Sequence, residues 1–299
     1  MLLTEAFDLT LKLLYNRSKL VFIIITKKIN YIKIQGANMQ SLPTFLIQTQ
    51  NLSKSFNKKK SNNNFVLNNI NLIIPQGKTV GLVGHSGCGK STLGKILIRL
   101  IPPSSGTVFY KKQNIFALPN SKFKPFRREL QMVFQDPFSS LDNLLTVEQI
   151  LTEGLRLYKI CDRKNESEFI NNLLNLVNLK LLVKNKHPSE LSGGECQRVA
   201  IARSLSVNPK FIVFDESTSA LDAITEYQII KTIKNLQSKI GLTYLFISHN
   251  IGLVKDVADE IAVMENGKIV EFGKSNTVYN NPSHLHTKEL INSFKAGWK

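Results

Sequence analysis

The stretch "TVGLVGHSGCGKSTLGKILIRL", residues 79–100, decides the fold of this chain. The segment "TVGLV" predicts a buried strand, and "STLGKILIRL" carries apolar residues at helical spacing. Between them, Gly84, Gly89, Lys90 and Ser91 fit the pattern G-x-x-x-x-G-K-[ST], which requires a strand before it and a helix after it. The sequence therefore predicts a nucleotide site at residues 84–92, here called the phosphate loop.

Each part of such a loop has a chemical task. Glycines allow backbone N–H groups to close around phosphate oxygens. Lys90 supplies a positive charge to the β and γ oxygens of ATP, and Ser91 offers its hydroxyl to Mg²⁺. The expected nucleotide-binding residues of the loop are Gly84, His85, Ser86, Gly87, Cys88, Gly89, Lys90, Ser91 and Thr92.

The rest of the chain alternates between strand and helix patterns. Strands are predicted in "FLIQTQNL", "VLNNINLII", "GTVFYKKQNI", "QMVFQ", "FIVFDE" and "TYLFIS", and a hairpin in "IAVMENGKIVEFG" is predicted to turn at Asn266 and Gly267. Helices are predicted near 221–239 and in "NIGLVKDVAD", and residues 142–190 form a mostly helical insert. This alternation predicts an α/β fold with a largely parallel sheet that is covered on both faces.

Composition sets the class of protein and its expected compartment. The chain has 299 residues, 42% of them apolar, which is enough for a sizeable core. The run "LVFIII" at 20–25 is too short to cross a membrane, and it lacks the flanks of a signal peptide, so we expect the cytoplasm. Residues 1–40 differ in composition from the rest and are interpreted as an N-terminal extension or as a misread start before Met39. One ATP-binding domain is expected at 45–295.

The net charge and the cysteines give little further information about function. The net charge is +17, but the basic clusters at 57–60 and 122–128 have no interleaved aromatic residues, so no nucleic-acid partner is expected. Cys88, Cys161 and Cys196 have neither the spacing of a zinc site nor the even count of a disulfide framework.

Two adjacent acids end one predicted strand. In "FIVFDES", residues 211–217, alternation places Asp215 and Glu216 on opposite sides of the strand end. Asp215 is expected to hold Mg²⁺, and Glu216 to orient or deprotonate the attacking water. Gln135 and His249 also end apolar strands, at the sheet edge where ligands gather. Alone, the two acids could be solvated acids at a strand end, and Gln135 or His249 would more often be a turn residue or a cap than a catalytic residue.

A second glycine-rich helix start occurs in "LSGGECQRVAIARSL", residues 191–205. The free N–H groups and the positive dipole end of a helix starting near Gly194 suit a phosphate. One chain therefore carries two such phosphate-binding segments.

Taken in order, "VFQDP" with Gln135, "LSGGECQR", "FIVFDES", "SALD" (219–222) and "FISHN" resemble the motifs of ATP-binding-cassette (ABC) ATPases from about 45 to 295. The resemblance implies a P-loop NTPase cassette: a RecA-like mixed sheet core, an antiparallel β subdomain and an α-helical subdomain at about 142–190. It also implies hydrolysis of ATP with Mg²⁺.

The resemblance further implies how two cassettes share their sites. Ser192, Gly193 and Gly194 of one chain would close on the γ-phosphate held by Lys90 of the other. The resemblance also implies the following roles: Phe56 stacks on adenine, Gln135 senses Mg²⁺ and links to the membrane subunit, Asp222 bridges the dimer, and His249 contacts the γ-phosphate. Ser217, the pair Glu195-Cys196 and Asn250 depart from the usual pattern, but none of these departures removes a group that touches phosphate.

The segments "QMVFQDPFSSL", "PSELSGGECQRVAIARSL" and "VYNNPSHLHTKELINSF" are similar to ATPase subunits of the oligopeptide, dipeptide and nickel importers. This resemblance implies a sister cassette, two membrane permease subunits and a solute-binding protein as partners. It also implies a peripheral location on the cytoplasmic face of the inner membrane. The solute, peptide or nickel, stays open. His284 and His286 in the tail are interpreted as inert histidines of a surface segment.

Two competing functions are weighed against the importer. A soluble ABC ATPase that acts on nucleic acid or ribosomes is conceivable from the net charge, but such proteins usually join two cassettes or add zinc or coiled-coil insertions. A regulatory cassette without hydrolysis is disfavoured by the presence of Lys90, Asp215, Glu216 and His249.

Overall fold

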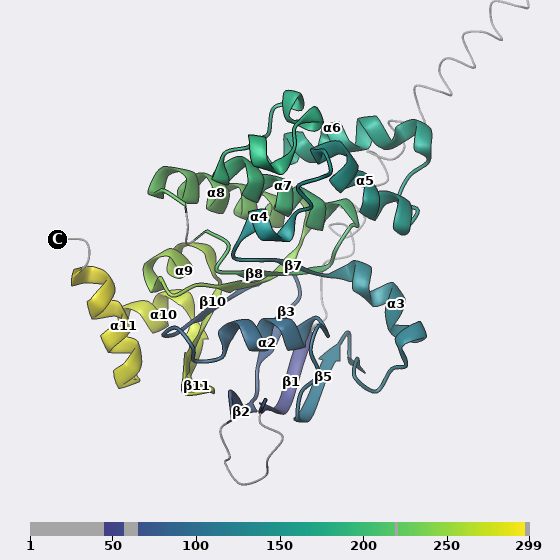
Figure 1. Ribbon diagram of the computed structural model, residues 1–299. Coiled ribbons are helices and arrows are strands. Elements are labelled where there is room, and N and C mark those ends of the chain that lie inside the picture. Colours follow the sequence, from purple (N-terminus) through teal and green to yellow (C-terminus); the bar gives the residue numbers. More distant parts are fainter. Residues whose placement is uncertain (1–44, 57–64, 219–220, 297–299) are drawn as a thin grey trace, which may run out of the picture. The chain divides into compact units, whose positions relative to one another are not determined.

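The computed structural model describes residues 45–56, 65–218 and 221–296, which lie in the compact unit Pro43–Lys299 (Figure 1). The expected N-terminal extension, residues 1–40, lies outside the described residues, and so do residues 219 and 220 of the "SALD" motif.

A six-stranded sheet forms the centre of this unit, in the order β11-β10-β4-β9-β8-β7. Its strands are β4 (Thr79–Val83), β7 (Leu130–Val133), β8 (Phe211–Asp215), β9 (Thr243–Ile247), β10 (Glu260–Glu265) and β11 (Lys268–Lys274). Neighbours from β10 to β7 run parallel, and only β10 and β11 pair antiparallel. Every residue of β4, β8 and β9 is buried, as expected for strands covered on both faces. The predicted mixed, largely parallel sheet is confirmed.

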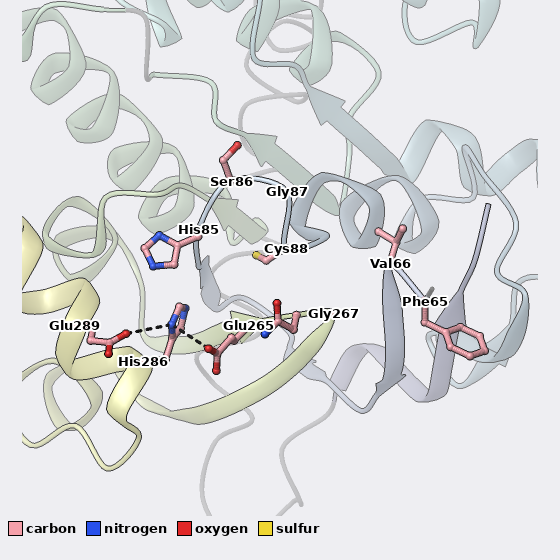
Figure 2. Close-up of a pocket in the computed structure, with 11 residues that line it drawn as sticks. Phe65, Val66, His85, Ser86, Gly87, Cys88, Glu265, Gly267, His286 and Glu289 are labelled. Carbon is pink, nitrogen blue, oxygen red and sulfur yellow. Dashed lines mark ion pairs between the residues drawn. The ribbon is translucent and has the colours of Figure 1, made fainter. Parts of the chain in front are cut away.

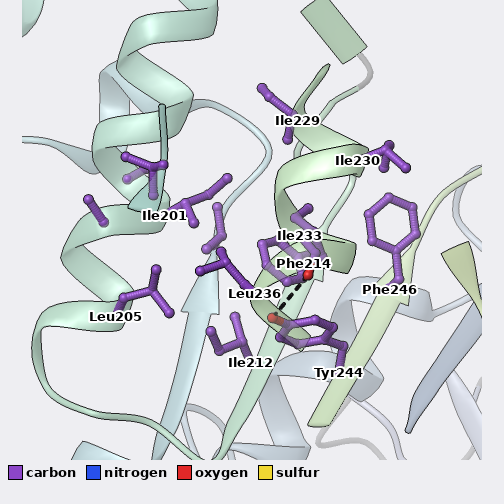
Figure 3. Packing of buried hydrophobic residues seen from close by; sticks show 14 of the residues in the cluster. Ile201, Leu205, Ile212, Phe214, Ile229, Ile230, Ile233, Leu236, Tyr244 and Phe246 are labelled. Atoms are coloured by element: carbon purple, nitrogen blue, oxygen red, sulfur yellow. Dashed lines mark hydrogen bonds between the residues drawn. The ribbon is translucent and has the colours of Figure 1, made fainter. Parts of the chain in front are cut away.

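Strand alternation divides the core into two clusters, one on each face of this sheet. In β8, Ile212 and Phe214 belong to one cluster, whereas Phe211 and Val213 belong to the other. The first cluster includes α7 (Gly193–Ser206), α8 (Ala223–Ile240) and α9 (Ile251–Val257), and Figure 3 shows side chains of α7 and α8 against β8 and β9. The second cluster includes α2 (Lys90–Leu97). The helices α2 and α7 therefore lie on opposite faces of the large sheet.

A smaller antiparallel sheet contributes to the second cluster. It contains β1 (Phe45–Lys54), β2 (Leu67–Ile70), β3 (Ile73–Pro75), β5 (Ser105–Tyr110) and β6 (Gln113–Asn114). The prediction of one strand over "VLNNINLII" was wrong, because the chain breaks between β2 and β3. Asn69, near the end of β2, has a left-handed backbone. In the break itself, Asn71 accepts a hydrogen bond from the backbone of Asn51, and Thr49 accepts one from Leu72.

The strand predicted over "GTVFYKKQNI" is also divided. Lys111 and Lys112 both have positive φ, 50° and 66°, which is the backbone of a tight two-residue hairpin turn between β5 and β6. The hairpin turn predicted at Asn266 and Gly267 is confirmed, with φ values of 47° and 76°.

The helical insert is built around α5 (Val147–Leu157) and α6 (Glu166–Leu176), which both contact α7. The short α4 (Pro137–Ser140) precedes them, and three short 3₁₀ helices at 163–165, 181–185 and 188–190 complete the segment. Thr146 and Gln149 form a capping box that fixes the start of α5. Figure 1 shows α5, α6 and α7 grouped on one side of β7 and β8.

The helix α3 was not predicted from the sequence. Residues "NSKFKPFRRE" form α3 (Asn120–Glu129), although Pro125 lies inside it. Phe123 is buried, and the guanidinium of Arg99 lies 4.5 Å from its ring centroid. Burial of this ring against the second cluster outweighs the weak local helix signal.

The chain ends in α10 (Ser275–Asn280) and α11 (Leu285–Ala296), and α11 packs on α9. In the part of the chain that the structure describes, no helix has both the length and the apolar character that a membrane crossing requires.

Phe214 is the residue by which the stability of this core is best tested. Its ring is fully buried and packs edge-to-face on Tyr244, with centroids 5.2 Å apart. We expect Phe214→Ala to lower the free energy of unfolding by about 3 to 5 kcal/mol in urea denaturation. The control Phe272→Ala, on exposed β11, should cost about 1 kcal/mol or less. Equal losses in the two variants would contradict this packing.

Candidate functional site

The phosphate loop joins β4 to α2, as predicted, and α2 begins at Lys90. Lys90 is only 4% exposed, and its Nζ donates to the backbone oxygens of Gly84 at 2.9 Å and of His85 at 3.0 Å. A buried ammonium needs such partners, since desolvation without them is costly. The loop therefore holds its lysine inward, at the centre of the site.

The first glycine of the loop is fixed by close contact. A Cβ on Gly84 would lie 2.2 Å from the backbone oxygen of Met264 in β10 and 2.8 Å from Sγ of Cys88. Gly87 has φ of 80° but no atom within 4 Å of a Cβ position. Glycine at 84 is therefore required by packing, and glycine at 87 by backbone conformation alone.

A hydroxyl and a carboxylate lie side by side next to Lys90. Asp215 ends β8, and its Oδ1 accepts a hydrogen bond of 2.7 Å from Oγ of Ser91 at the start of α2. Burial raises the pKa of Asp215 above its ordinary value, and the bond from Ser91 opposes that rise. Both are oxygen donors of the kind that Mg²⁺ takes, so the pair fits a magnesium site.

Glu216 is the point on which the other predicted residues converge. One of its carboxylate oxygens, Oε1, lies 3.6 Å from Nζ of Lys90. The other, Oε2, lies 3.4 Å from Nε2 of Gln135 and 4.0 Å from Nδ1 of His249. Glu216 also has a left-handed φ of 46°, a conformation that costs a non-glycine residue about 1 kcal/mol or more. The structure thus brings together all three residues predicted as catalytic.

Two details of this convergence differ from the sequence prediction. The strands end before the functional residues, β7 at Val133 and β9 at Ile247, so Gln135 and His249 lie two residues beyond them. Glu216 likewise follows β8 instead of ending it. The polar residues therefore occupy the loops just outside the sheet edge, which frees their side chains to turn toward one another.

The second phosphate-binding segment forms a separate group. Ser192 caps α7 and shares a capping box with Glu195, and hydrogen bonding to Ser192 lowers the pKa of Glu195. A Cβ on Gly194 would lie 2.4 Å from Cγ2 of Thr225 in α8. Asp222 caps the same helix, α8, by accepting from the backbone of Thr225. Ser192, Gly193, Gly194 and Asp222 are thus assembled at the adjoining starts of α7 and α8.

The structure explains why a glutamate stands at position 195, where the sequence departs from the usual pattern. Glu195 completes the Ser-x-x-Glu capping box at the start of α7, a signal that was readable in the sequence.

Phe56 follows the end of β1 and has a ring that is 60% exposed, with Nζ of Lys54 4.9 Å from its centroid. Its role in stacking on adenine stays a prediction.

Comparison with protein families identifies this arrangement. Residues 67–219, from β2 through the loop that follows Glu216, match the family model described as ABC transporter. The chain belongs to the ABC transporter family.

Relatives of this ABC protein extend the match over most of its length. It is 41% identical to the putative oligopeptide transport ATP-binding protein YkfD of Bacillus subtilis (strain 168), over 85% of this chain and 77% of the relative. It is also 41% identical to the dipeptide transport ATP-binding protein DppF of Lactococcus lactis subsp. cremoris, over 85% of this chain and 82% of the relative.

Solved structures confirm the ABC cassette fold. The structure of cbiO1 from Clostridium perfringens, part of the ABC transporter complex cbiONQ, superposes with a TM-score of 0.72 at 25% identity over 85% of this chain and 95% of that one. The cassette MJ0796, a dimer in a post-hydrolysis state bound to ADP and Pi, gives a TM-score of 0.69 at 29% identity. This match covers 77% of this chain and 98% of that one.

One interpretation of the ABC protein's tail was wrong. His286 is not a surface residue: it is 5% exposed and lies beside the phosphate loop, in a cavity of about 580 Å³ (Figure 2). The cavity is lined by Phe65, Val66, His85, Ser86, Gly87, Cys88, Glu265, Asn266, Gly267, His286 and Glu289. Within the described residues, no group of three or more His, Cys, Asp or Glu side chains is placed to hold a metal ion.

The two glycines of the loop give a matched test of its geometry. Gly84→Ala should lower the free energy of unfolding by about 2 to 3 kcal/mol, because the new methyl group meets backbone that cannot rotate away. Gly87→Ala has room and should cost only its left-handed strain, about 1 kcal/mol. Urea denaturation of both variants measures the difference. A larger loss for Gly87→Ala would contradict the close packing of Gly84 on β10.

Proposed function

We propose that this chain is the ATP-hydrolysing subunit of a membrane importer that takes up peptides, with ATP and Mg²⁺ bound at the phosphate loop. The observation that carries the proposal is the convergence of Lys90, Gln135 and His249 on Glu216, next to the Ser91 and Asp215 pair. The names of the relatives favour peptides over nickel as the solute.

Each residue of the cluster has a distinct part in this reaction. Ser91 and Asp215 would hold Mg²⁺, with Gln135 beside them, and the ion would neutralise charge on the phosphate oxygens. Lys90 binds the β and γ oxygens, for which it exchanges its bonds to the carbonyls of Gly84 and His85. The loop glycines leave the backbone N–H groups free to approach the phosphates.

Glu216 is the residue placed to act on water. Its carboxylate lies between Nζ of Lys90 and the side chains of Gln135 and His249. A water bound to this carboxylate would face the γ-phosphate. Glu216 orients that water and accepts its proton, while His249 contacts the γ-phosphate.

A second cassette completes the site. The group at the starts of α7 and α8 lies on the face of the large sheet opposite to α2, so we assign it to the nucleotide of a partner chain. Such a partner would be a sister cassette, in a complex with two permease subunits and a solute-binding protein at the cytoplasmic face of the inner membrane. Leu144 and Leu182 in the helical insert are exposed apolar side chains that the permease would cover.

The assignment of Glu216 is tested by Glu216→Gln in the purified chain with its sister cassette. We expect ATP affinity to persist and the hydrolysis rate to fall about a hundredfold or more, since the amide cannot take a proton. The control Glu168→Gln changes an exposed carboxylate on α6 and should leave the rate unchanged. Undiminished turnover in Glu216→Gln would remove Glu216 from its role.

The same variant tests the transport function in cells. In a strain that lacks this gene, the wild-type gene should restore uptake of a labelled dipeptide, and Glu216→Gln should not. If the gene restores uptake of labelled nickel alone, the solute assignment is wrong. If uptake of neither solute depends on the gene, the importer assignment itself fails.

A further inference from the structure

The side chain of His286 connects the tail of the chain to the phosphate loop. His286, the second residue of α11, lies 201 positions after His85 (286 − 85 = 201), yet their rings meet edge-to-face with centroids 4.9 Å apart. Such a pair of aromatic rings at this distance is attractive and geometrically specific. Figure 2 shows the two rings beside the loop, His286 coming from α11 and His85 from the loop.

Two carboxylates lie near one nitrogen of the His286 ring. Its Nδ1 lies 3.4 Å from Oε1 of Glu265, at the end of β10, and 3.9 Å from Oε2 of Glu289, one turn further along α11. Glu265 is the stronger anchor, because it is closer and comes from a strand of the central sheet. The ring is thus held against the sheet on one side and against the loop on the other.

The burial of the His286 ring carries a cost in free energy. Its Nε2 is buried and has no hydrogen-bond partner within the described residues, and a buried polar atom of this kind carries a desolvation penalty. The ring therefore keeps its place through its contacts with Glu265 and His85, and not through a bond at Nε2.

His85 connects this ring to the functional lysine. The backbone oxygen of His85 accepts from Nζ of Lys90 at 3.0 Å and from the backbone N–H of Cys88 at 3.3 Å. A displacement of the His85 backbone would move this oxygen, and with it both the turn of the loop and the resting place of the ammonium. The chain of contacts therefore runs from Glu265 through His286 and His85 to Lys90.

We propose that His286 is a positioning residue for the nucleotide site, which fixes the phosphate loop through its contact with His85 before ATP binds. The inference rests on the proposed function, because it gives the C-terminal helix a part in ATP binding. The inference predicts that His286 raises the affinity for ATP, since a loop that is already ordered loses less conformational freedom when it closes on phosphate. The chemical step, which depends on Glu216, should be little affected.

The first test needs no nucleotide. In the full nucleotide-free chain, hydrogen exchange of the backbone amides at 84–90 should be about three- to tenfold faster in His286→Ala than in the wild type, the range expected for loss of one such ring contact. His286→Phe keeps a ring against His85 and should retain most of the protection. The control Leu290→Ala removes a buried side chain of the same helix and should lower the melting temperature without this local change.

The second test measures ATP. His286→Ala should raise the Kd for ATP and the KM for hydrolysis by about three- to tenfold and leave kcat nearly unchanged. In a double-mutant cycle, His85→Ala should add little to His286→Ala, because both remove the same contact.

These results separate the inference from the proposed function. If the wild type fails to bind ATP, the function is wrong, whereas the exchange experiment still decides the role of His286. If exchange at 84–90 is unchanged in His286→Ala, or rises as much in Leu290→Ala, the positioning role is overturned. Additive effects of the two histidine substitutions would also overturn it.

Discussion

The burial of Lys90 is the constraint on which the rest of the site depends. An ammonium in this position must be surrounded by oxygen atoms, and the chain supplies them from the loop itself and from Glu216. Gly84 packs tightly on β10 where the loop carbonyls face inward, and Glu216 approaches Lys90 in a left-handed conformation after β8. The central sheet thus fixes both the cation and the carboxylate that stands next to it.

The two phosphate-binding segments of the chain follow from its architecture. The helices α2 and α7 lie on opposite faces of the large sheet, so their N-termini belong to different groups of residues. Lys90, Asp215 and Glu216 surround one of them, whereas Asp222 and Thr225 accompany the other. Under the proposed function, a single chain would present two halves of nucleotide sites, and each site would be completed by a second cassette.

Local patterns in the sequence were sufficient for the central six-stranded sheet and for the residues around Lys90. The loop between strand and helix, the acids after "FIVF" and the Asn266-Gly267 turn each depend on residues close in sequence. Two features that were missed depend on distant contacts. The helix α3 forms around buried Phe123 despite Pro125, and His286 is buried by His85, far away in the chain. Periodicity carries no signal for such contacts.

Gly193 offers the most direct test that the start of α7 serves the partner's nucleotide. A Cβ at this position meets only Cδ2 of Leu221, at 3.6 Å, so Gly193→Ala fits within its own chain. The measurement is the ATP affinity of the isolated variant chain, set beside its hydrolysis rate in the assembled transporter. We predict unchanged affinity and a rate that is lower by about a hundredfold, because the methyl group holds the partner's phosphate away. Loss of ATP affinity in the isolated chain, equal to that of Lys90→Ala, would contradict the account.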